Sequence, residues 1–146
     1  NEIIRSFEEI SEKRFKLNLD KFSEKIAICK STEIIYGLRN FIGNANKFSK
    51  KKVDIFISTM KNKTLIKIVD DGDGFPKDLI NKEKIGQPYI RTLENTDMSK
   101  QGLGLGTFIG KTLLEKNFAT VTFKNSDATN GAEVIIEWKN LVLIKI

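Results

Sequence analysis

The sequence predicts an α+β domain, a two-layer sandwich in which helices cover one face of a mixed, mainly antiparallel sheet. Two segments, residues 32–49 and 105–113, repeat apolar side chains at helical spacing. Shorter apolar segments bounded by polar or glycine-containing turns have the pattern of strands. Helices and hairpins are thus segregated along the chain, which favours this architecture. With 146 residues, 40% of them hydrophobic, residues 1–146 are expected to form one domain.

The elements are predicted in chain order from the same patterns. A first helix is expected from Ile3 to about Arg14, and two short strands between Phe15 and Cys29. The first long helix then runs from about Thr32 to Ser49, with Ser31 or Thr32 as its N-cap. Residues 76–101 are polar and long for a connection, as in functional lids. The remaining strands are expected at residues 53–57, 65–69, 118–125, 131–138 and 141–146.

The composition excludes several kinds of active site. The chain contains no histidine, which removes histidine-based triads, general bases and metal sites. Any metal must therefore be held by oxygen ligands, which favours magnesium or calcium. The single Cys29 excludes an internal disulfide and indicates a reducing compartment. The net charge of +6 allows an anionic partner, but no nucleic-acid-binding motif is present, so none is expected to bind directly.

Three segments carry candidate chemistry, and the first lies on the long helix. Asn40, Asn44 and Lys47 share one stripe of that helix, opposite the core stripe. Amide oxygens can ligate a cation without competing in charge with phosphates, while a lysine offsets the remaining negative charge. Phe48, at the edge of the stripe, can pack beside an adenine ring. A polar outer helix face is the competing interpretation.

The second segment, Asp70 to Gly74, follows an apolar strand directly. Gly72 and Gly74 permit a sharp turn close to a flat ligand, and a carboxylate at the strand end can accept from an exocyclic amine. Calcium binding by an EF-hand is excluded, because Lys82 stands where a bidentate glutamate is required. The competing interpretation is a simple acidic turn.

The third segment opens the second amphipathic helix. Backbone N–H groups of a glycine-rich helix N-terminus bind phosphate oxygens. A P-loop is disfavoured because only three residues separate Gly106 from Gly110, where four are needed. The residues of this segment are Gly102, Leu103, Gly104, Leu105 and Gly106.

In this order the three segments resemble the N, G1 and G2 boxes of the Bergerat-type ATPase fold shared by histidine kinases, gyrase, Hsp90 and MutL. The resemblance to sensor histidine kinases is the closest, since Asn40 to Phe48 reads Asn-x-x-x-Asn-Ala-x-Lys-Phe. Residues 85–89, the glycine segment with its helix, and the closing Gly131-Ala132 resemble redox-responsive kinases of the RegB/PrrB type. The resemblance implies that the domain binds ATP and Mg²⁺.

It also implies a role for each matching residue. Asn44 would be the principal magnesium ligand, with Asn40 nearby and Lys47 on phosphate, so that Asn44 and Lys47 carry the catalysis. Phe48 would lie against adenine and Asp70 would bind its N6 amine. Gly72 and Gly74 would shape that wall. The third segment would line the triphosphate and close the lid through Gly102, Leu103, Gly104, Leu105 and Gly106.

The implied partners are the dimerisation and histidine-phosphotransfer domain of a parent kinase and a response regulator. The parent is expected to be a homodimer in the bacterial inner membrane, with this chain a monomeric cytoplasmic domain. The phosphoacceptor hairpin, sensor and membrane segments are expected to lie outside the chain. Two alternatives stay open: an anti-sigma serine kinase, and a non-catalytic, nucleotide-dependent interaction domain.

Overall fold

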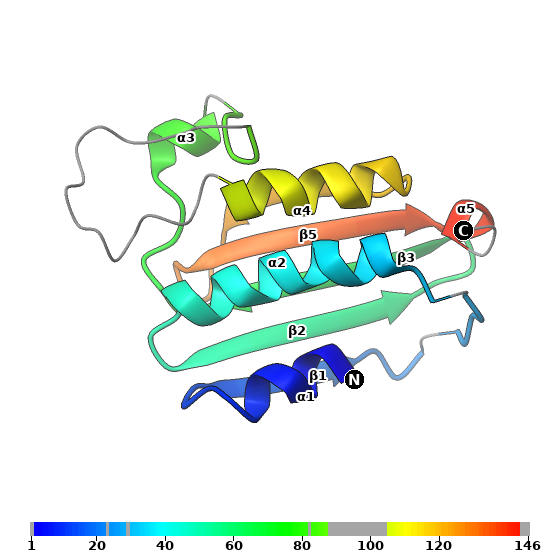
Figure 1. Cartoon of the computed structure of the whole chain (residues 1–146), viewed down its shortest axis with the longest axis horizontal. Coiled ribbons are helices and arrows are strands. Elements are labelled where there is room, and N and C mark those ends of the chain that lie inside the picture. Colours follow the sequence, from blue (N-terminus) through cyan, green and yellow to red (C-terminus); the bar gives the residue numbers. More distant parts are fainter. Residues whose placement is uncertain (1, 23, 29, 82, 88–104, 144–146) are drawn as a thin grey trace.

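A computed structural model describes residues 2–22, 24–28, 30–81, 83–87 and 105–143. It confirms the predicted architecture: helices lie against one face of a five-stranded sheet (Figure 1). The elements are α1 (Glu2–Glu8), β1 (Arg14–Leu19), α2 (Thr32–Phe48), β2 (Lys52–Thr59), β3 (Lys63–Asp70), α3 (Lys77–Asn81), α4 (Leu105–Lys116), β4 (Thr120–Asn125), β5 (Ala132–Lys139) and α5 (Asn140–Leu143).

The sheet is mixed, with the strand order β1-β2-β3-β5-β4. Only β1 and β2 are parallel; the other neighbouring pairs are antiparallel. Val53 pairs with Asp70 and Val69 pairs with Glu133, so β2 and β5 begin where β3 ends. The turn that follows β3 therefore lies beside the junction between α2 and β2 and beside the start of β5.

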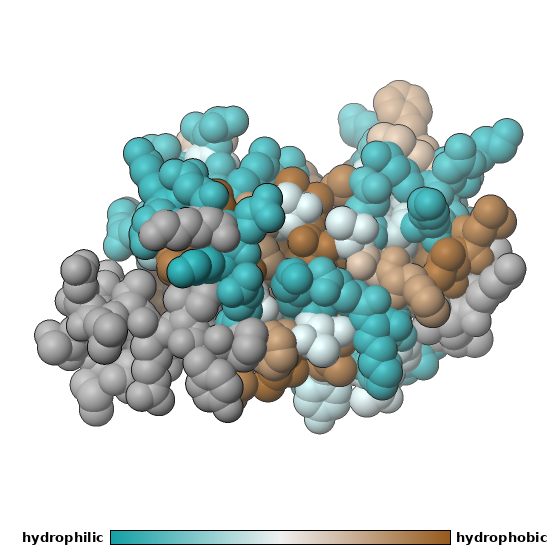
Figure 2. Space-filling view, turned by 90° about the horizontal axis from the view of Figure 1, so that it is seen from above, coloured by the Kyte–Doolittle hydropathy of each residue, from teal (hydrophilic) through white to brown (hydrophobic). Residues whose placement is uncertain are grey.

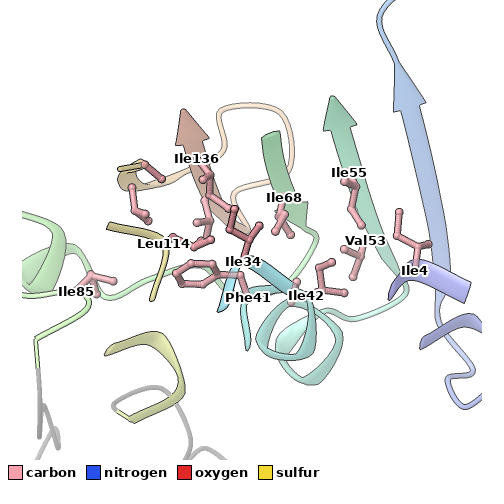
Figure 3. Packing of buried hydrophobic residues seen from close by; sticks show 14 of the residues in the cluster. Ile4, Ile34, Phe41, Ile42, Val53, Ile55, Ile68, Ile85, Leu114 and Ile136 are labelled. Carbon is pink, nitrogen blue, oxygen red and sulfur yellow. The ribbon is translucent and has the colours of Figure 1, made fainter. Parts of the chain in front are cut away.

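Helix α2 begins at an N-cap, because the Ser31 side chain accepts a hydrogen bond from the Ile34 amide at 3.3 Å. Its buried stripe includes Ile34, Phe41 and Ile42, which face the sheet residues of the core (Figure 3). The opposite stripe is left polar. Amphipathic spacing thus fixes which side of α2 is available to a ligand.

Helices α2 and α4 lie side by side over the sheet (Figure 1) and approach each other very closely. A Cβ on Gly37 would lie 2.7 Å from Leu114 Cγ, and one on Gly110 would lie 3.2 Å from the Gly37 carbonyl oxygen. The far ends of the two helices are joined through Glu33, whose carboxylate contacts Lys116 Nζ at 2.6 Å and Asn117 Nδ2 at 2.7 Å. The two helices are therefore held together at their close crossing near Gly37 and Gly110, and at the end where Glu33 meets Lys116.

Three sequence predictions were wrong at the edges of the fold. The first helix ends at Glu8 rather than near Arg14, and Ile10 is left 79% exposed. Residues 24–28 form no strand; Ile28 is exposed and the segment is joined to the sheet through Glu24 N, which donates to Thr59 O at 2.8 Å. The apolar residues of that segment alternate, but the segment does not form the ladder of hydrogen bonds with a neighbouring strand that a β-strand requires.

The predicted final strand at residues 141–146 was also wrong over residues 141–143, because Asn140–Leu143 is the short helix α5, and residues 144–146 lie outside the described residues. Asn140 is buried and its side chain bonds Thr64 Oγ1 at 2.7 Å and Met60 O at 2.6 Å. These bonds turn the chain at the end of β5. Leu143 then packs into the core while Leu141 is exposed, which suits a helical turn better than an extended strand.

Helix α3 was missed within the polar stretch after Pro76, where Leu79 packs into the core. Seen from above in Figure 2, the surface is mainly hydrophilic, with apolar side chains in small patches between polar ones. In the part of the chain that the structure describes, none of the helices has both the length and the apolar character needed to cross a bilayer.

Candidate nucleotide-binding site

The first and third predicted segments meet where α4 begins. A Cβ on Gly106 would lie 3.4 Å from Asn40 Oδ1 and 3.7 Å from Asn44 Oδ1. Gly106 therefore brings the backbone of the first turn of α4 beside two amide oxygens of α2. Leu105, the first residue of α4, is 61% exposed. Gly102, Leu103 and Gly104 lie outside the described residues.

The Asn44 side chain is held in one orientation by a residue that the sequence analysis missed. Its Nδ2 donates to Thr107 Oγ1 at 3.0 Å, and Thr107 is only 2% exposed. Asn40 Nδ2 in turn donates to Tyr36 O at 2.9 Å. Both amide nitrogens are therefore hydrogen-bonded within the protein. The Asn40 oxygen lies nearest to Gly106, while the oxygen and nitrogen of Asn44 lie at almost equal distances, 3.7 Å and 3.8 Å, from a Cβ placed there. The signal for Thr107 was its place in the first turn after the glycine segment.

Lys47 and Phe48 lie one turn further along α2, at its C-terminal end. Lys47 is exposed, Phe48 is half-buried, and Lys47 Nζ lies 5.4 Å from the centre of the Phe48 ring. The contact is a cation–π interaction, which keeps the ammonium group and the ring on the same side of the helix. The predicted polar stripe of α2 thus lies on a different side of the helix from the buried residues Phe41 and Ile42.

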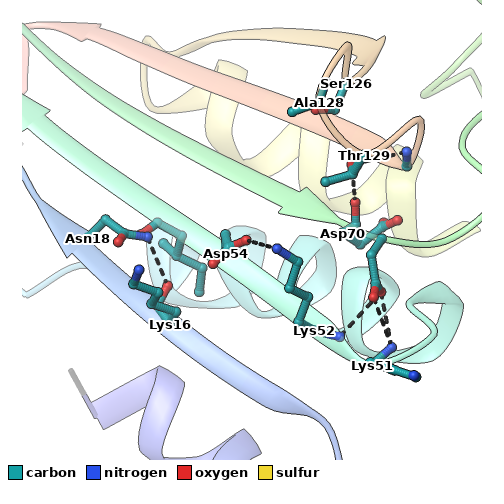
Figure 4. A network of polar contacts seen from close by, with 12 residues as sticks. Lys16, Asn18, Lys51, Lys52, Asp54, Asp70, Ser126, Ala128 and Thr129 are labelled. Carbon is teal, nitrogen blue, oxygen red and sulfur yellow. Dashed lines mark hydrogen bonds and ion pairs between the residues drawn. The ribbon is translucent and has the colours of Figure 1, made fainter.

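Asp70 is a carboxylate fixed at the end of β3. It is 3% exposed, and its Oδ1 accepts from Gly72 N at 2.8 Å and from Ala132 N at 3.1 Å. The Thr129 hydroxyl donates to the Asp70 carbonyl at 2.8 Å (Figure 4). Burial raises the pKa of Asp70 above its ordinary value, although the two amide hydrogen bonds act in the opposite direction.

Two glycines of the second segment bring the backbone into close contact with its surroundings. A Cβ on Gly72 would lie 2.3 Å from the carbonyl oxygen of Phe48, so this turn lies against the C-terminal end of α2. Gly74 has a φ of +78°, a conformation that other residues rarely adopt. The structure therefore joins the second predicted segment to the first at Phe48.

The other side of the same turn is held by β4 and the start of β5, which the sequence analysis did not connect with it. The Asn125 side chain accepts from Phe75 N at 2.7 Å and donates to Phe75 O at 2.9 Å. The backbone of Gly131 is so close to Asp70 that a Cβ added to Gly131 would lie 2.0 Å from the carbonyl oxygen of Asp70. These contacts link residues 50 or more positions apart, which local sequence patterns do not reveal.

Comparison with known proteins identifies the family. Residues 29–141 match the family model described as histidine kinase-, DNA gyrase B- and HSP90-like ATPase. The sensor histidine kinase RegB of Cereibacter sphaeroides is 38% identical over 104 residues, covering 68% of this chain and 22% of RegB. CpxA of Escherichia coli K12, also a sensor histidine kinase, is 31% identical over 102 residues, covering 69% of this chain and 21% of CpxA. The chain spans about a fifth of the length of these curated relatives.

Solved structures agree with the fold. The catalytic domain of the histidine kinase ThkA superposes with a TM-score of 0.75 at 25% identity, covering 94% of this chain and 89% of ThkA's. The mycobacterial sensor histidine kinase MprB gives a TM-score of 0.71 at 19% identity, covering 94% and 91%. Since the family match includes all three predicted segments and the fold agrees, the chain belongs to the histidine kinase-, DNA gyrase B- and HSP90-like ATPase family.

Proposed function

We propose that this chain binds Mg-ATP and donates the γ-phosphate to a histidine on a separate dimerisation domain, as the kinase part of a two-component system. The observation that carries the proposal is the meeting of two amide oxygens, Asn40 and Asn44, with the N-terminal turn of α4 at Gly106. RegB and CpxA, both sensor histidine kinases, favour this function over an anti-sigma serine kinase or a non-catalytic module.

The amide pair fits a magnesium ion. Carboxamide oxygens are ligands that Mg²⁺ accepts, and the ion commonly keeps several waters and phosphate oxygens in its shell. Thr107 accepts a hydrogen bond from Asn44 Nδ2, and the Asn44 oxygen lies 3.7 Å from the position of a Cβ on Gly106. We assign Asn44 as the principal magnesium ligand with Asn40 beside it. The ion would neutralise charge on the transferring phosphoryl group.

The triphosphate is assigned to the start of α4. The 12-residue helix α4 begins at Leu105 and Gly106. The first N–H groups of a helix have no partner within the helix and lie at the positive end of its dipole, which suits them to bind phosphate. Gly102, Leu103 and Gly104 are proposed to extend this phosphate-binding backbone. Lys47, exposed at the end of α2, supplies a cation to the same phosphates. Positioning and charge are the main requirements of phosphoryl transfer, and these groups supply both.

The adenine ring is assigned to the turn after β3. Within the described residues, both hydrogen bonds recorded at the Asp70 carboxylate go to Oδ1, which leaves Oδ2 to accept from the adenine N6 amine. Gly72 and Gly74 form the wall behind the ring, and Phe48 packs against it. A buried carboxylate that can only accept from N6 favours adenine over guanine, whose corresponding group is a carbonyl.

The acceptor must come from elsewhere, because the chain has no histidine. We propose that the parent protein supplies it on a dimerising helical hairpin and passes the phosphoryl group to a response regulator. The parent is proposed to be a homodimer anchored in the bacterial inner membrane, with this domain on the cytoplasmic side.

The proposal is tested by calorimetry and by phosphotransfer. ATP should bind in the presence of Mg²⁺ with a dissociation constant between about 1 μM and 1 mM. Labelled ATP should then transfer phosphate to a separately prepared hairpin that carries the acceptor histidine, and not to the same hairpin with glutamine at that position. No binding of adenine nucleotide with Mg²⁺ present would refute the proposed function.

The chain offers a matched pair of variants for the metal site. Asn44→Ala should remove the magnesium dependence of ATP binding and lower phosphotransfer by at least about tenfold while the protein stays folded. Asn46→Ala is the control, since Asn46 lies on the same helix but bonds Ser11 Oγ at 2.6 Å, away from Gly106. Equal activity of the two variants would show that Asn44 is not the metal ligand.

A further inference from the structure

Asp71, to which the nucleotide-binding proposal gives no role, accepts hydrogen bonds from three consecutive backbone amides. Its Oδ1 lies 2.8 Å from Lys50 N, 3.1 Å from Lys51 N and 3.2 Å from Lys52 N, and its Oδ2 lies 3.2 Å from Lys51 N. The bonds to Lys51 and Lys52 are drawn in Figure 4. Successive amides of this kind form an anion-binding concavity. Here a carboxylate of the protein itself occupies it.

The electrostatic surroundings keep this carboxylate ionised. Burial acts to raise the pKa of Asp71, but the hydrogen bonds from the amides of Lys51, Lys52 and Lys50 outweigh it, and the pKa is lowered. The side chains around the concavity are also basic. The hollow beside it has a volume of about 860 Å³. Its basic lining residues are Lys13, Arg14, Lys47, Lys50, Lys51 and Lys52, and the other lining residues are Ile10, Ser11, Glu12, Asn46 and Asp71.

The same junction between α2 and β2 is also held by a cation. Lys13 Nζ donates to the carbonyl oxygens of Asn46 and, at 2.7 Å, of Ser49. A lysine thus satisfies the last carbonyls of α2, while Asp71 satisfies the amides that follow the helix. In sequence, Lys47 and Phe48 lie between Asn46 and Ser49, the two residues whose carbonyl oxygens accept from Lys13.

In sequence, Asp71 lies between two residues that are assigned to the nucleotide site. Asp70, immediately before it, carries the carboxylate assigned to adenine. Gly72, immediately after it, lies so near the Phe48 carbonyl that an added Cβ would be 2.3 Å from its oxygen. A shift of the Asp71 contact therefore changes the spacing between the turn after β3 and the end of α2. That spacing separates Asp70 from Phe48 and Lys47.

We propose that Asp71 is a positioning residue for nucleotide binding: its carboxylate fixes the adenine-binding turn against the α2–β2 junction, without itself touching the nucleotide. The inference rests on the proposed function. Its energetic basis is that hydrogen bonds to an ionised group are the stronger ones, so three of them on one side chain define the spacing more firmly than neutral contacts.

Asp71→Ala should raise the dissociation constant for Mg-ATP about tenfold, which equals about 1.4 kcal/mol. Asp71→Asn keeps one acceptor oxygen without the charge and should raise it about threefold. Asp73→Ala is the matched control, because Asp73 is an exposed carboxylate of the same turn, paired with Lys50 Nζ at 3.0 Å. It should bind ATP like the wild type. Circular dichroism and thermal melting of each variant establish that the protein assayed is folded.

Phosphotransfer to the separate hairpin supplies a second measurement. A positioning role in binding predicts that the KM for ATP rises in Asp71→Ala while kcat at saturating ATP stays within about twofold of the wild type. A kcat that falls with an unchanged KM would overturn the inference. So would an equal loss of affinity in Asp73→Ala, because that would reflect loop charge alone.

The two proposals fail in different ways. A wild-type protein that binds no Mg-ATP refutes the proposed function and this inference with it. A wild-type protein that binds Mg-ATP while folded Asp71→Ala binds equally well refutes the inference alone. If Asp71→Ala does not fold, Asp71→Asn decides the question, and wild-type affinity in that variant overturns the inference.

Discussion

Gly72→Ala should weaken ATP binding strongly, because the added methyl group has no room. Its carbon would lie 2.3 Å from the Phe48 carbonyl oxygen and 3.0 Å from Asp70 Oδ1, whereas ordinary contact begins at 3.4 Å. The turn and the end of α2 must therefore separate by about 1 Å. Overpacking of this kind costs about 1–3 kcal/mol of folding stability. A misplacement of about 1 Å within a binding site can cost about a hundredfold in function.

The matched control is Gly43→Ala on α2, next to Asn44. A Cβ there would meet only the Phe7 ring, at 3.8 Å, so no displacement is needed. Alanine is the better helix former, and the variant should gain about 0.5–1 kcal/mol of stability. Displacement of a fluorescent ATP analogue measures affinity, and urea unfolding measures stability. Folded Gly72→Ala with ATP affinity within about threefold of the wild type would refute the reasoning, as would an equal loss in Gly43→Ala.

Three further outcomes are expected. Leu114→Ala, which empties a fully buried position between α2 and α4, should lower the free energy of unfolding by about 2–5 kcal/mol in urea titrations. Asp70→Asn should lose discrimination between ATP and GTP, because an amide can also donate; equal weakening for both nucleotides would assign Asp70 a structural role. Unfolding measured against pH should separate the two acids. The pKa of Asp70 is raised, so its contribution to the free energy of unfolding is present below pH 3.8 and is lost as the pH rises. Asp70→Asn should therefore become more stable relative to the wild type as the pH rises. The pKa of Asp71 is lowered, so its contribution to the free energy of unfolding is present above pH 3.8 and is lost as the pH falls. Asp71→Asn should therefore become less stable relative to the wild type as the pH rises.

The sequence predicted those parts of the site that depend on local periodicity. Helical spacing alone separated Asn40 and Asn44 from the core residues Phe41 and Ile42, and an apolar strand followed by glycines located Asp70. The fold class followed from the same periodicities. The elements themselves were right wherever an apolar stripe packs on the sheet, as in α2, α4 and β2 to β5.

What sequence reasoning missed depends on contacts between distant residues. Thr107, Asn125 and Gly131 act through partners on other elements, and local patterns do not reveal those partners. The last predicted strand failed for the same reason, since the buried hydrogen bonds of Asn140 turn the chain where apolar composition alone favours extension. The contacts of Asp71 also lie beyond local patterns, because its three amide partners are 19 to 21 residues earlier in the chain.

The close crossing of α2 and α4 has a mechanical consequence. Glu33 joins the two helices near Lys116, at the end of α4 away from Gly106. At about 1.5 Å per residue, α4 extends about 15 Å from that joint to Gly106, at the end that is proposed to bind phosphate. A rotation of about 4° about the joint thus moves Gly106 by about 1 Å, while the sheet-facing side chains near Leu114 move far less. A small rotation of α4 about the Glu33 joint would thus change the position of Gly106, which is proposed to bind the triphosphate, more than that of the core residue Leu114.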